Sequence, residues 1–570
     1  MEDHSASSAC FHSNDTLADQ LPDSTADGRA RKQALAALAR TVWDGTGVVN
    51  YQSAGRVLIL DELGQGPGRP RALDAAGQLV ADGCTCTVLL DGLEADSRDQ
   101  VSRKLSTKTI TVVAGRLAKL HGHLGHYSAW LDGKREDVDL AALGPAKSEF
   151  FDLVLDLGAT PYLQREVPPP GYYATGNDEQ ALQQALQAIP SKTGDFSKPV
   201  YIKYRSNICA HGGDNVSGCS RCLDVCPAEA ISDKGSRVEV NTSLCQGCGS
   251  CIINCPTAAL SYTYPPVQQW LVLLREMLKT YAAAGGTRPA VLLYDECGAG
   301  NLQAVAADLP EHVIPVEVHG IGALGADAWL ALLAYGAGAV LVLAGDGTPG
   351  RVVSTLQSQL DVVQAILQGM GYRVESLRLM DADGLKTLAD DLAAGQLGVE
   401  TPAAGFDPFE KAITVRMAVD HLYRHAPQKP EYVDLPPGAA FGEIQVDKAG
   451  CTLCMSCVTA CPAKALRHDA ANLRLELTET SCVQCGACDS ICPEDAITLL
   501  PRYAYDESVA GKPRLLNEDE PFRCISCGKP FAGRRMLDKV VEKLSGNNTW
   551  NVSRDSVPEW LQKCGDCRIK

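Results

Sequence analysis

The chain has 570 residues, a formal net charge of −17 and 24 cysteines. This length exceeds what one hydrophobic core supports, so we expect about three to five domains. The acidic balance disfavours nucleic acid and favours basic protein partners, whose attraction weakens in salt. The cysteines are grouped as metal ligands are, which argues against the disulfide framework of a secreted protein.

Residues 1–28 are rich in Ser, Asp, Ala and Thr without a periodic pattern, so we expect a disordered tail. They lack a basic segment followed by an apolar one, so we expect no secretory signal and a cytoplasmic location. Residues 29–170 alternate apolar strands with amphipathic helices, the pattern of an α/β domain with a largely parallel sheet. The Pro-Pro-Pro-Gly stretch at 168–171 predicts its boundary. Strands are predicted at 56–60, 86–90, 109–113 and 151–157, and helices at 31–42, 72–82 and 96–104.

Residues 200–265 contain a complete C-x2-C-x2-C-x3-C-P run that begins at Cys245. This spacing binds a 4Fe-4S cluster, and in two-cluster ferredoxins the fourth cysteine of each run ligates the other cluster. The preceding run is irregular, because Val216 stands where its first cysteine is expected. Cys209 lies upstream across a glycine-containing loop that lets its thiolate fold back. We predict one cluster on Cys209, Cys219, Cys222 and Cys255, and another on Cys245, Cys248, Cys251 and Cys226.

Three alternatives stay open at the irregular site: His211 as a ligand, a three-iron cluster, or an empty site. Disulfides or zinc sites explain the regular runs less well, because zinc sites usually pair C-x2-C knuckles without a third cysteine and C-P. A C-P-x-x-A-[IL] tail follows each run and predicts a short helix and an internal duplication.

Residues 266–400 predict a helix and a second α/β domain. The helix, Val267 to Tyr281, has an apolar face, and strands are predicted at 290–294, 313–318, 339–343 and 372–379. The apolar stretch 326–344 is interrupted by Asp327 and two glycines, so we interpret it as a helix and a buried strand rather than a membrane span. The loops at 61–66 and 295–300 look like copies, but neither completes G-x-G-x-x-G, so we expect structural turns. Cys84, Cys86 and Cys297 are expected to pack in the core, and a reactive or ligating thiol is the alternative at Cys297.

Residues 401–440 predict a helical linker that opens with a capping box at Asp407-Pro408-Phe409-Glu410. Residues 441–500 repeat the C-x2-C-x2-C-x3-C-P spacing twice, which predicts a second dicluster module. We predict one cluster on Cys451, Cys454, Cys457 and Cys492, and another on Cys482, Cys485, Cys488 and Cys461.

Beyond Pro501 the chain reads as a polar linker, and residues 520–570 contain two C-x2-C knuckles. Such knuckles suit a closed, structural zinc site, and a rubredoxin-type iron site uses the same four ligands. We expect zinc in a zinc-ribbon-like module. The predicted ligands are Cys524, Cys527, Cys564 and Cys567.

The expected fold is therefore multidomain, α/β plus α+β, with two Rossmann-like units, two dicluster ferredoxin modules and the C-terminal module. Four 4Fe-4S clusters in one chain predict an electron wire, and their potentials depend on hydrogen bonds to sulfur, exposure and charge. The sequence has no Ser-His-Asp order, HExxH motif or Walker loop, so an electron carrier or subunit is favoured over a self-contained enzyme. A flavin-containing oxidoreductase and a non-catalytic maturation or scaffold protein are the alternatives.

With these motifs, the chain resembles large bacterial 4Fe-4S binding proteins found beside cytoplasmic molybdenum or tungsten formate dehydrogenases. The stretch from Gly325-Ala326-Asp327-Ala328-Trp329-Leu330 through Val340-Leu341-Val342-Leu343 resembles the delta-subunit domain of methyl-viologen-reducing hydrogenases. The resemblance implies single-electron relay between a redox enzyme such as formate dehydrogenase and a ferredoxin or NAD-linked acceptor. That hydrogenase domain carries cysteines for a two-iron cluster, but here Cys297 is the only thiol in the corresponding unit, so we expect a docking role.

Overall fold

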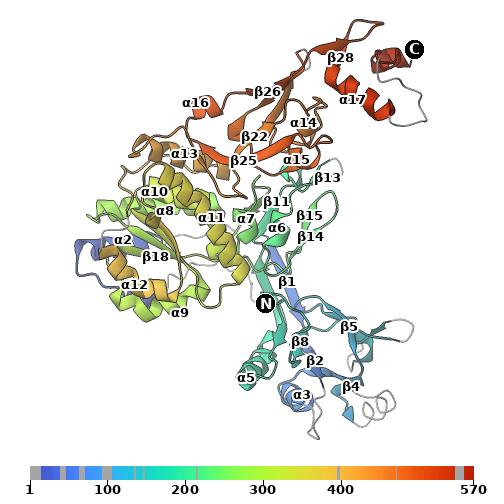
Figure 1. The fold of residues 1–570 in the computed structure, drawn as a ribbon. Helices are drawn as coiled ribbons and strands as arrows, with labels where there is room; N and C mark the ends of the chain where they lie inside the picture. The colour runs from blue at the N-terminus through green and yellow to red at the C-terminus, as the bar shows by residue number, and fades with distance from the viewer. Residues whose placement is uncertain are drawn as a thin grey trace.

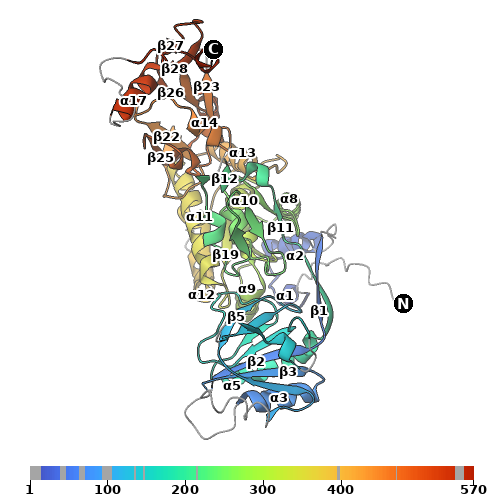
Figure 2. The same cartoon turned by 90° about the vertical axis from the view of Figure 1, so that its right-hand side faces the viewer.

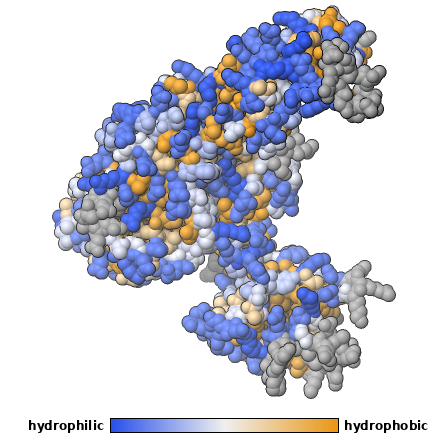
Figure 3. Space-filling view, viewed as in Figure 1, coloured by the Kyte–Doolittle hydropathy of each residue, from blue (hydrophilic) through white to orange (hydrophobic). Residues whose placement is uncertain are grey.

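The molecule is elongated, with an N-terminal α/β unit at one end and a C-terminal module at the other (Figures 1 and 2). A second α/β unit and two cysteine-rich units lie between them. In the space-filling view, most of the visible surface is hydrophilic, and a narrow waist joins the N-terminal unit to the body (Figure 3). The computed structural model describes residues 15–38, 47–62, 71–92, 105–133, 137–144, 148–213, 216–393, 398–469, 472–545 and 557–569.

The N-terminal α/β unit is built on a five-stranded parallel sheet in the order β4-β3-β2-β8-β9. The middle strand, β2, is buried along most of its length because both faces of the sheet are covered. Two helices cover one face, and a small antiparallel sheet covers the other. The elements are β2 (Arg56–Glu62), α3 (Arg71–Ala81), β3 (Thr85–Asp91), β4 (Ile110–Ala114), β5 (Leu117–His121), β6 (Ser128–Leu131), β7 (Val138–Asp139), β8 (Leu153–Asp156), β9 (Tyr172–Ala174) and α5 (Glu179–Ala188).

The predicted strands of this unit are confirmed as β2, β3, β4 and β8, but the predicted boundary at 168–171 is wrong. After the prolines the chain returns to the sheet, where β9 pairs in parallel with β8. Leu182 and Leu186 of α5 are then buried in the same core. The helix predicted at 96–104 lies outside the described residues.

A two-stranded antiparallel ribbon connects this unit to the body of the molecule (Figure 1). Its strands are β1 (Val48–Ser53) and β10 (Gly194–Pro199). The hydroxyl of Tyr51 donates a hydrogen bond of 2.7 Å to the Ser243 carbonyl. The ribbon therefore contacts the first cysteine unit directly.

The second α/β unit has a four-stranded parallel sheet in the order β18-β17-β19-β20. Helices cover both faces, since alternate residues of β17 and β19 contribute to two separate cores. All residues of α10 are buried, and α10 and β19 confirm the predicted helix followed by a strand. The elements are α8 (Val267–Ala283), β17 (Ala290–Tyr294), α9 (Glu296–Val305), β18 (Val313–Glu317), α10 (Ala326–Ala334), β19 (Ala339–Leu343), α11 (Gly350–Gly369), β20 (Leu377–Met380) and α12 (Ala382–Ala393).

The N-terminal segment belongs to this second unit, which corrects the prediction of a disordered tail over residues 1–28. Residues 1–14 lie outside the described part, but α1 (Asp15–Ala18) brings Leu17 into the core of the second sheet, and Leu21 is buried there too. Helix α2 (Ala26–Leu38) packs against α8. Arg31 of α2 is 1% exposed and donates to the carbonyls of Pro310 and Val313, both at 3.1 Å. Buried hydrogen bonds of this kind hold the segment in place.

The two linking helices differ in how well they were predicted. Helix α8 is confirmed, and its predicted apolar face is buried. Apolar residues at helical spacing indicate one buried face, so the prediction succeeds where burial is periodic. Helix α13 (Lys411–Arg424) packs against α10 but begins after the predicted capping box. Glu410 is its N-cap without a side-chain hydrogen bond, and the Phe409 N–H instead donates to Thr414 Oγ1 at 2.9 Å.

The two cysteine units share one plan of two antiparallel strand pairs and two short helices. The first pairs β11 (Ile202–Tyr204) with β16 (Leu260–Tyr262) and β14 (Ile231–Asp233) with β15 (Val238–Val240), and contains α6 (Arg221–Asp224) and α7 (Ser250–Ile253). The second pairs β22 (Gly442–Val446) with β25 (Ile497–Ala504) and β23 (Leu466–Asp469) with β24 (Arg474–Leu477), and contains α14 (Ser456–Ala460) and α15 (Ala487–Ser490).

The second cysteine unit is larger than predicted. Strand β21 (Tyr432–Asp434) pairs with β25, and β26 (Arg514–Glu518) pairs with β24. The stretch after Pro501 is therefore part of a sheet rather than a linker, because its strands find partners distant in sequence. Beyond it lie β27 (Pro521–Arg523), β28 (Pro530–Gly533), α17 (Arg534–Ser545) and α18 (Gly565–Arg568). Within the described ranges, no helix is long and apolar enough to cross a bilayer.

We predict that Glu311→Gln loosens the N-terminal segment. The Glu311 carboxylate accepts hydrogen bonds from the hydroxyls and amides of Ser24 and Thr25, and these lower its pKa from 4.5 to about 2. A lowered carboxyl pKa stabilises the fold above the ordinary pKa, and this contribution is lost as pH falls from about 4.5 toward 2. Hydrogen exchange at Thr25 and Gly28 should become several-fold faster in the variant at neutral pH.

Wild-type exchange at these amides should accelerate as the pH is lowered through this window, whereas the variant should show no such acceleration beyond intrinsic exchange. Glu375→Gln, an exposed change in the same α/β unit, is the control. Equal exchange in all three proteins at neutral pH would contradict the prediction.

Candidate metal centres

Four cavities in the cysteine units are each lined by four cysteines, three from one run and one from the other. The chain thus brings together every cysteine set predicted for a 4Fe-4S cluster. The sets are Cys209, Cys219, Cys222 and Cys255; Cys226, Cys245, Cys248 and Cys251; Cys451, Cys454, Cys457 and Cys492; and Cys461, Cys482, Cys485 and Cys488.

The recurring C-P-x-x-A sequence has a structural cause. The Ala230 N–H donates to Cys226 Sγ at 3.3 Å, and Ala465 donates to Cys461 Sγ at the same distance. The residue before each alanine has a positive φ, such as 49° at Glu229. This tight turn aims the fourth thiol of each run at the other cavity, and hydrogen bonds to sulfur also tune the potential of a bound cluster.

Left-handed residues shape the loops that present the three closely spaced cysteines. In the run from Cys245, both neighbours of Cys248 are glycines with positive φ, 78° at Gly247 and 86° at Gly249. The same positions of the second unit are also left-handed. In the irregular run the corresponding Ser220 has a φ of −106°, so this loop follows a different path.

A hairpin brings Cys209 to the irregular site. Strands β12 (Gly212–Gly213) and β13 (Val216–Ser217) pair, and the Cys219 N–H donates to the Ala210 carbonyl at 3.0 Å. The empty volume here, open solvent included, is about 320 Å³, against about 370 Å³ at each site of the second unit. The irregular site therefore has comparable room for a cluster.

His211, the alternative ligand, lines this cavity but both of its ring nitrogens are engaged. Nδ1 lies 2.8 Å from the Cys219 carbonyl, and Nε2 lies 3.0 Å from an Asp233 carboxylate oxygen. A histidine needs a free ring nitrogen to bind a metal. His211 is thus arranged to brace the hairpin rather than to ligate.

Burial controls the chemistry of the cysteine sets. It raises the pKa of Cys222 and Cys457 to about 12 each, with neighbouring cysteines as the next cause. Cys251 is raised well above the ordinary thiol pKa for the same reasons. Four such groups become thiolates together only when a cation joins them, so binding of iron releases protons and stabilises the folded loops.

Two lysines from other elements reach the first cysteine unit. Lys198 Nζ, from the ribbon, donates to the Cys245 carbonyl at 2.7 Å, and burial lowers its pKa to about 8. Lys411 Nζ, from α13, donates to the Ile253 carbonyl at 2.6 Å. Positive charge beside a cluster favours its reduced form. Neither lysine is predictable from the sequence, because no local pattern marks a residue that reaches a site through the fold.

The second α/β unit braces one of these loops. A Cβ on Gly322 would lie 2.5 Å from the Cys248 carbonyl, so the two backbones approach as closely as glycine permits. The Asp295 carboxylate secures this edge by accepting from the amides of Ile321 and Cys297, both at 3.1 Å. Cys297 was predicted to pack in the core, but its side chain is exposed. It lies in the first turn of α9, where the buried side of the helix is formed by Gly298 and Leu302 instead. Cys84 and Cys86 are buried, as predicted.

The C-terminal knuckles form a separate four-cysteine site. The four sulfur atoms of Cys524, Cys527, Cys564 and Cys567 all lie within 4.8 Å of one another. The Cys564 N–H donates to Cys524 Sγ at 3.3 Å, and this bond chiefly lowers the pKa of Cys524 to about 6. This arrangement is a four-thiolate metal site, which suits zinc or mononuclear iron.

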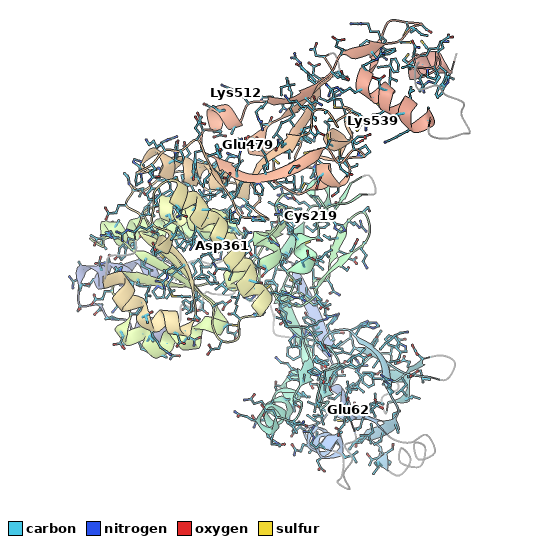
Figure 4. All side chains as sticks on the ribbon, in the orientation of Figure 1. Glu62, Cys219, Asp361, Glu479, Lys512 and Lys539 are labelled. Atoms are coloured by element: carbon cyan, nitrogen blue, oxygen red, sulfur yellow. The ribbon has the colours of Figure 1, made fainter. Side chains whose placement is uncertain are left out.

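Helix α17 connects this site to the second cysteine unit. Lys539, labelled in Figure 4, lies 3.6 Å from Glu494, and Lys543 lies 3.3 Å from the same carboxylate. Glu494 follows Cys492-Pro493 and lines the cavity of Cys451. The C-terminal module therefore lies beside the outermost of the four cavities.

Comparisons with known proteins agree with this geometry. Residues 216–263 match the LdpA Fe-S cluster-binding domain, and residues 450–497 match the 4Fe-4S dicluster domain. The first match covers every cysteine of the first unit except Cys209, and the second covers all cysteines of the second unit. No curated protein matches the chain. The chain is therefore an iron-sulfur protein that combines an LdpA-type Fe-S domain, a 4Fe-4S dicluster domain and a four-cysteine metal site.

We predict that Cys248→Ser and Cys485→Ser each remove about four of about sixteen irons per chain, because one cluster needs all four thiolates. Each change should also lower the stability of its own unit, since loop and ligands fold together. Iron and acid-labile sulfide are measured on protein purified without oxygen. Cys297→Ser, which changes a thiol outside the cavities, should keep the wild-type content. Full iron in both ligand variants would refute the assignment.

We also predict that Cys564→Ser releases the metal of the C-terminal site and leaves the iron of the four cavities unchanged. Three thiolates do not close a tetrahedral site, so affinity falls sharply. Elemental analysis for zinc and iron, with sulfide as the reference, separates the two kinds of site. A parallel loss of sulfide would show that the C-terminal site is not independent.

Proposed function

We propose that this protein relays single electrons through four 4Fe-4S clusters, as an electron carrier or an electron-transfer subunit rather than a self-contained enzyme. The clusters, when bound, supply one-electron chemistry. The observation that carries the proposal is that the four cysteine-lined cavities follow one another through both cysteine units. The ligand sets proposed are those that line each cavity.

Electrostatic influence between thiols supports this order. Besides burial, Cys222 helps to raise the pKa of Cys251, which joins the two cavities of the first unit. Cys485 acts in the same way on Cys219, across the boundary between the units. Cys457 acts on Cys488 within the second unit. Since such effects require proximity, the sites form one series from the second α/β unit to the C-terminal module.

The exposure of the thiols suggests where electrons enter and leave. Three of the four cysteines in the cavity of Cys245 are buried, whereas three of the four in the cavity of Cys451 are half-buried. The second cysteine unit is thus the more accessible end. A redox partner would approach the series most closely from this end, near α17.

The partners follow from charge and resemblance. A formal net charge of −17 favours redox proteins with basic docking surfaces. We propose a cytoplasmic redox enzyme of the formate dehydrogenase kind on one side and a ferredoxin or NAD-linked flavoprotein on the other. The four-cysteine site is proposed to hold zinc, because a closed thiolate set provides a structural centre without an open position.

A redox titration followed by EPR tests the proposal. Protein purified without oxygen should contain about sixteen irons and matching sulfide, and its reduced form should show interacting signals. After reduction, it should pass electrons in stopped-flow mixing to an oxidised redox protein with a basic docking surface, at a rate that falls with salt. Four clusters that cannot be reduced, or that reduce but donate to no acceptor, would overturn the proposal.

A further inference from the structure

The two cysteine units meet through the loops that carry their ligands. Arg221, between Cys219 and Cys222, extends its guanidinium to the second unit. It donates to the Gln484 carbonyl at 2.8 Å and to the Gly438 carbonyl at 3.0 Å. Gln484 lies between Cys482 and Cys485, the first two cysteines of a run in the second unit. Figure 4 labels Cys219 on the side of the first unit that faces the second.

Both ends of this contact are tied to the cavities. On one side, the Arg221 carbonyl accepts from the Asn254 side chain at 3.1 Å, directly before Cys255. On the other, the Gln484 side chain donates to Cys482 Sγ at 3.4 Å and to the Glu443 carbonyl at 2.8 Å. A chain of hydrogen bonds therefore runs from the ligand loop of one unit to that of the other.

The contact is close as well as directional. A Cβ on Gly218 would lie 3.7 Å from the Cβ of Ala487, so helix α15 comes within van der Waals distance of the first unit. Nearby, Arg416 of α13 donates to the Thr480 carbonyl at 3.2 Å. Several contacts thus hold the units together, and among them Arg221 joins two ligand loops through a hydrogen bond.

The charge of Arg221 is available to both cavities. Its guanidinium donates to backbone carbonyls, and in the described part of the chain no carboxylate forms an ion pair with it. Arg221 directly precedes Cys222, and its guanidinium reaches the carbonyl of Gln484, the residue directly before Cys485. One guanidinium therefore lies beside a ligand loop of each unit.

We propose that Arg221 is a positioning residue for electron exchange between the two cysteine units. Its guanidinium holds the two ligand loops in contact and places a positive charge between them, which favours the reduced state on both sides. In the exchange, one electron leaves one unit and enters the other, so one site is oxidised as the other is reduced and no bond forms or breaks. This inference rests on the proposed electron-transfer function.

The test compares Arg221→Gln with Arg221→Lys in the full-length, iron-loaded protein. Gln removes the charge, whereas Lys keeps it but lacks the planar fork that reaches two carbonyls. Arg237→Gln is the matched control, because it removes an exposed charge from a hairpin of the first unit. Iron content, EPR-monitored redox titration and the spin interaction between reduced clusters are measured in each protein.

In Arg221→Gln, two of the four midpoint potentials should shift to more negative values, and the spin interaction across the boundary should weaken. Arg221→Lys should keep midpoint potentials close to those of the wild type, because the charge remains. Its spin interaction across the boundary should be weaker than in the wild type. Arg237→Gln should match the wild type. A purely structural contact would change iron content or stability without moving the potentials of clusters that remain bound.

Full iron in Arg221→Gln with unchanged potentials and unchanged spin interaction would overturn the inference while leaving the proposed function intact. If Arg221→Gln loses iron, Arg221→Lys becomes the deciding variant. A spin interaction in Arg221→Lys equal to that of the wild type would also overturn the inference. A wild-type protein whose clusters cannot be reduced would instead refute the proposed function itself. The two failures are therefore distinguishable.

Discussion

Repulsion between buried thiolates is the constraint on which the central structure depends. Burial and neighbouring cysteines raise the pKa of ligands such as Cys222 and Cys251, so these groups share a cavity as thiolates only around a cation. Several of these cysteines belong to the same core as α8, α10 and α11. Metal binding and folding of the central body are therefore coupled, because the core contains the ligands.

The parts of the molecule differ in whether they share this core. The first cysteine unit is continuous with the second α/β unit, and Tyr503 and Tyr505 extend the same core to the second cysteine unit. The N-terminal α/β unit has cores of its own and reaches the body through the ribbon of β1 and β10. A rigid centre suits the proposed electron transfer, because transfer between sites requires fixed distances.

Local patterns predicted well those elements whose burial is periodic. Helix α8 has the expected buried face, and the apolar stretch from Ala326 became a helix and a strand because both are enclosed on every side. The failures involve distant partners. Leu17 is buried only because the second sheet covers it, and β26 is a strand only because β24 lies beside it. A short polar sequence carries no sign of such a partner.

The iron-sulfur character of the chain follows from its sequence alone, because three thiolates reach one cluster only from a tightly spaced loop, and spacing is visible in the sequence. It also marked the C-terminal cysteines as a metal site, for the same reason. The order of the sites and the charges that lie beside them depend on the fold as a whole. Arg221 and Gln484 are 263 residues apart and meet because whole surfaces pack together. Ligand spacing is a property of one loop, whereas the position of a charge between two sites depends on the packing of every element around it.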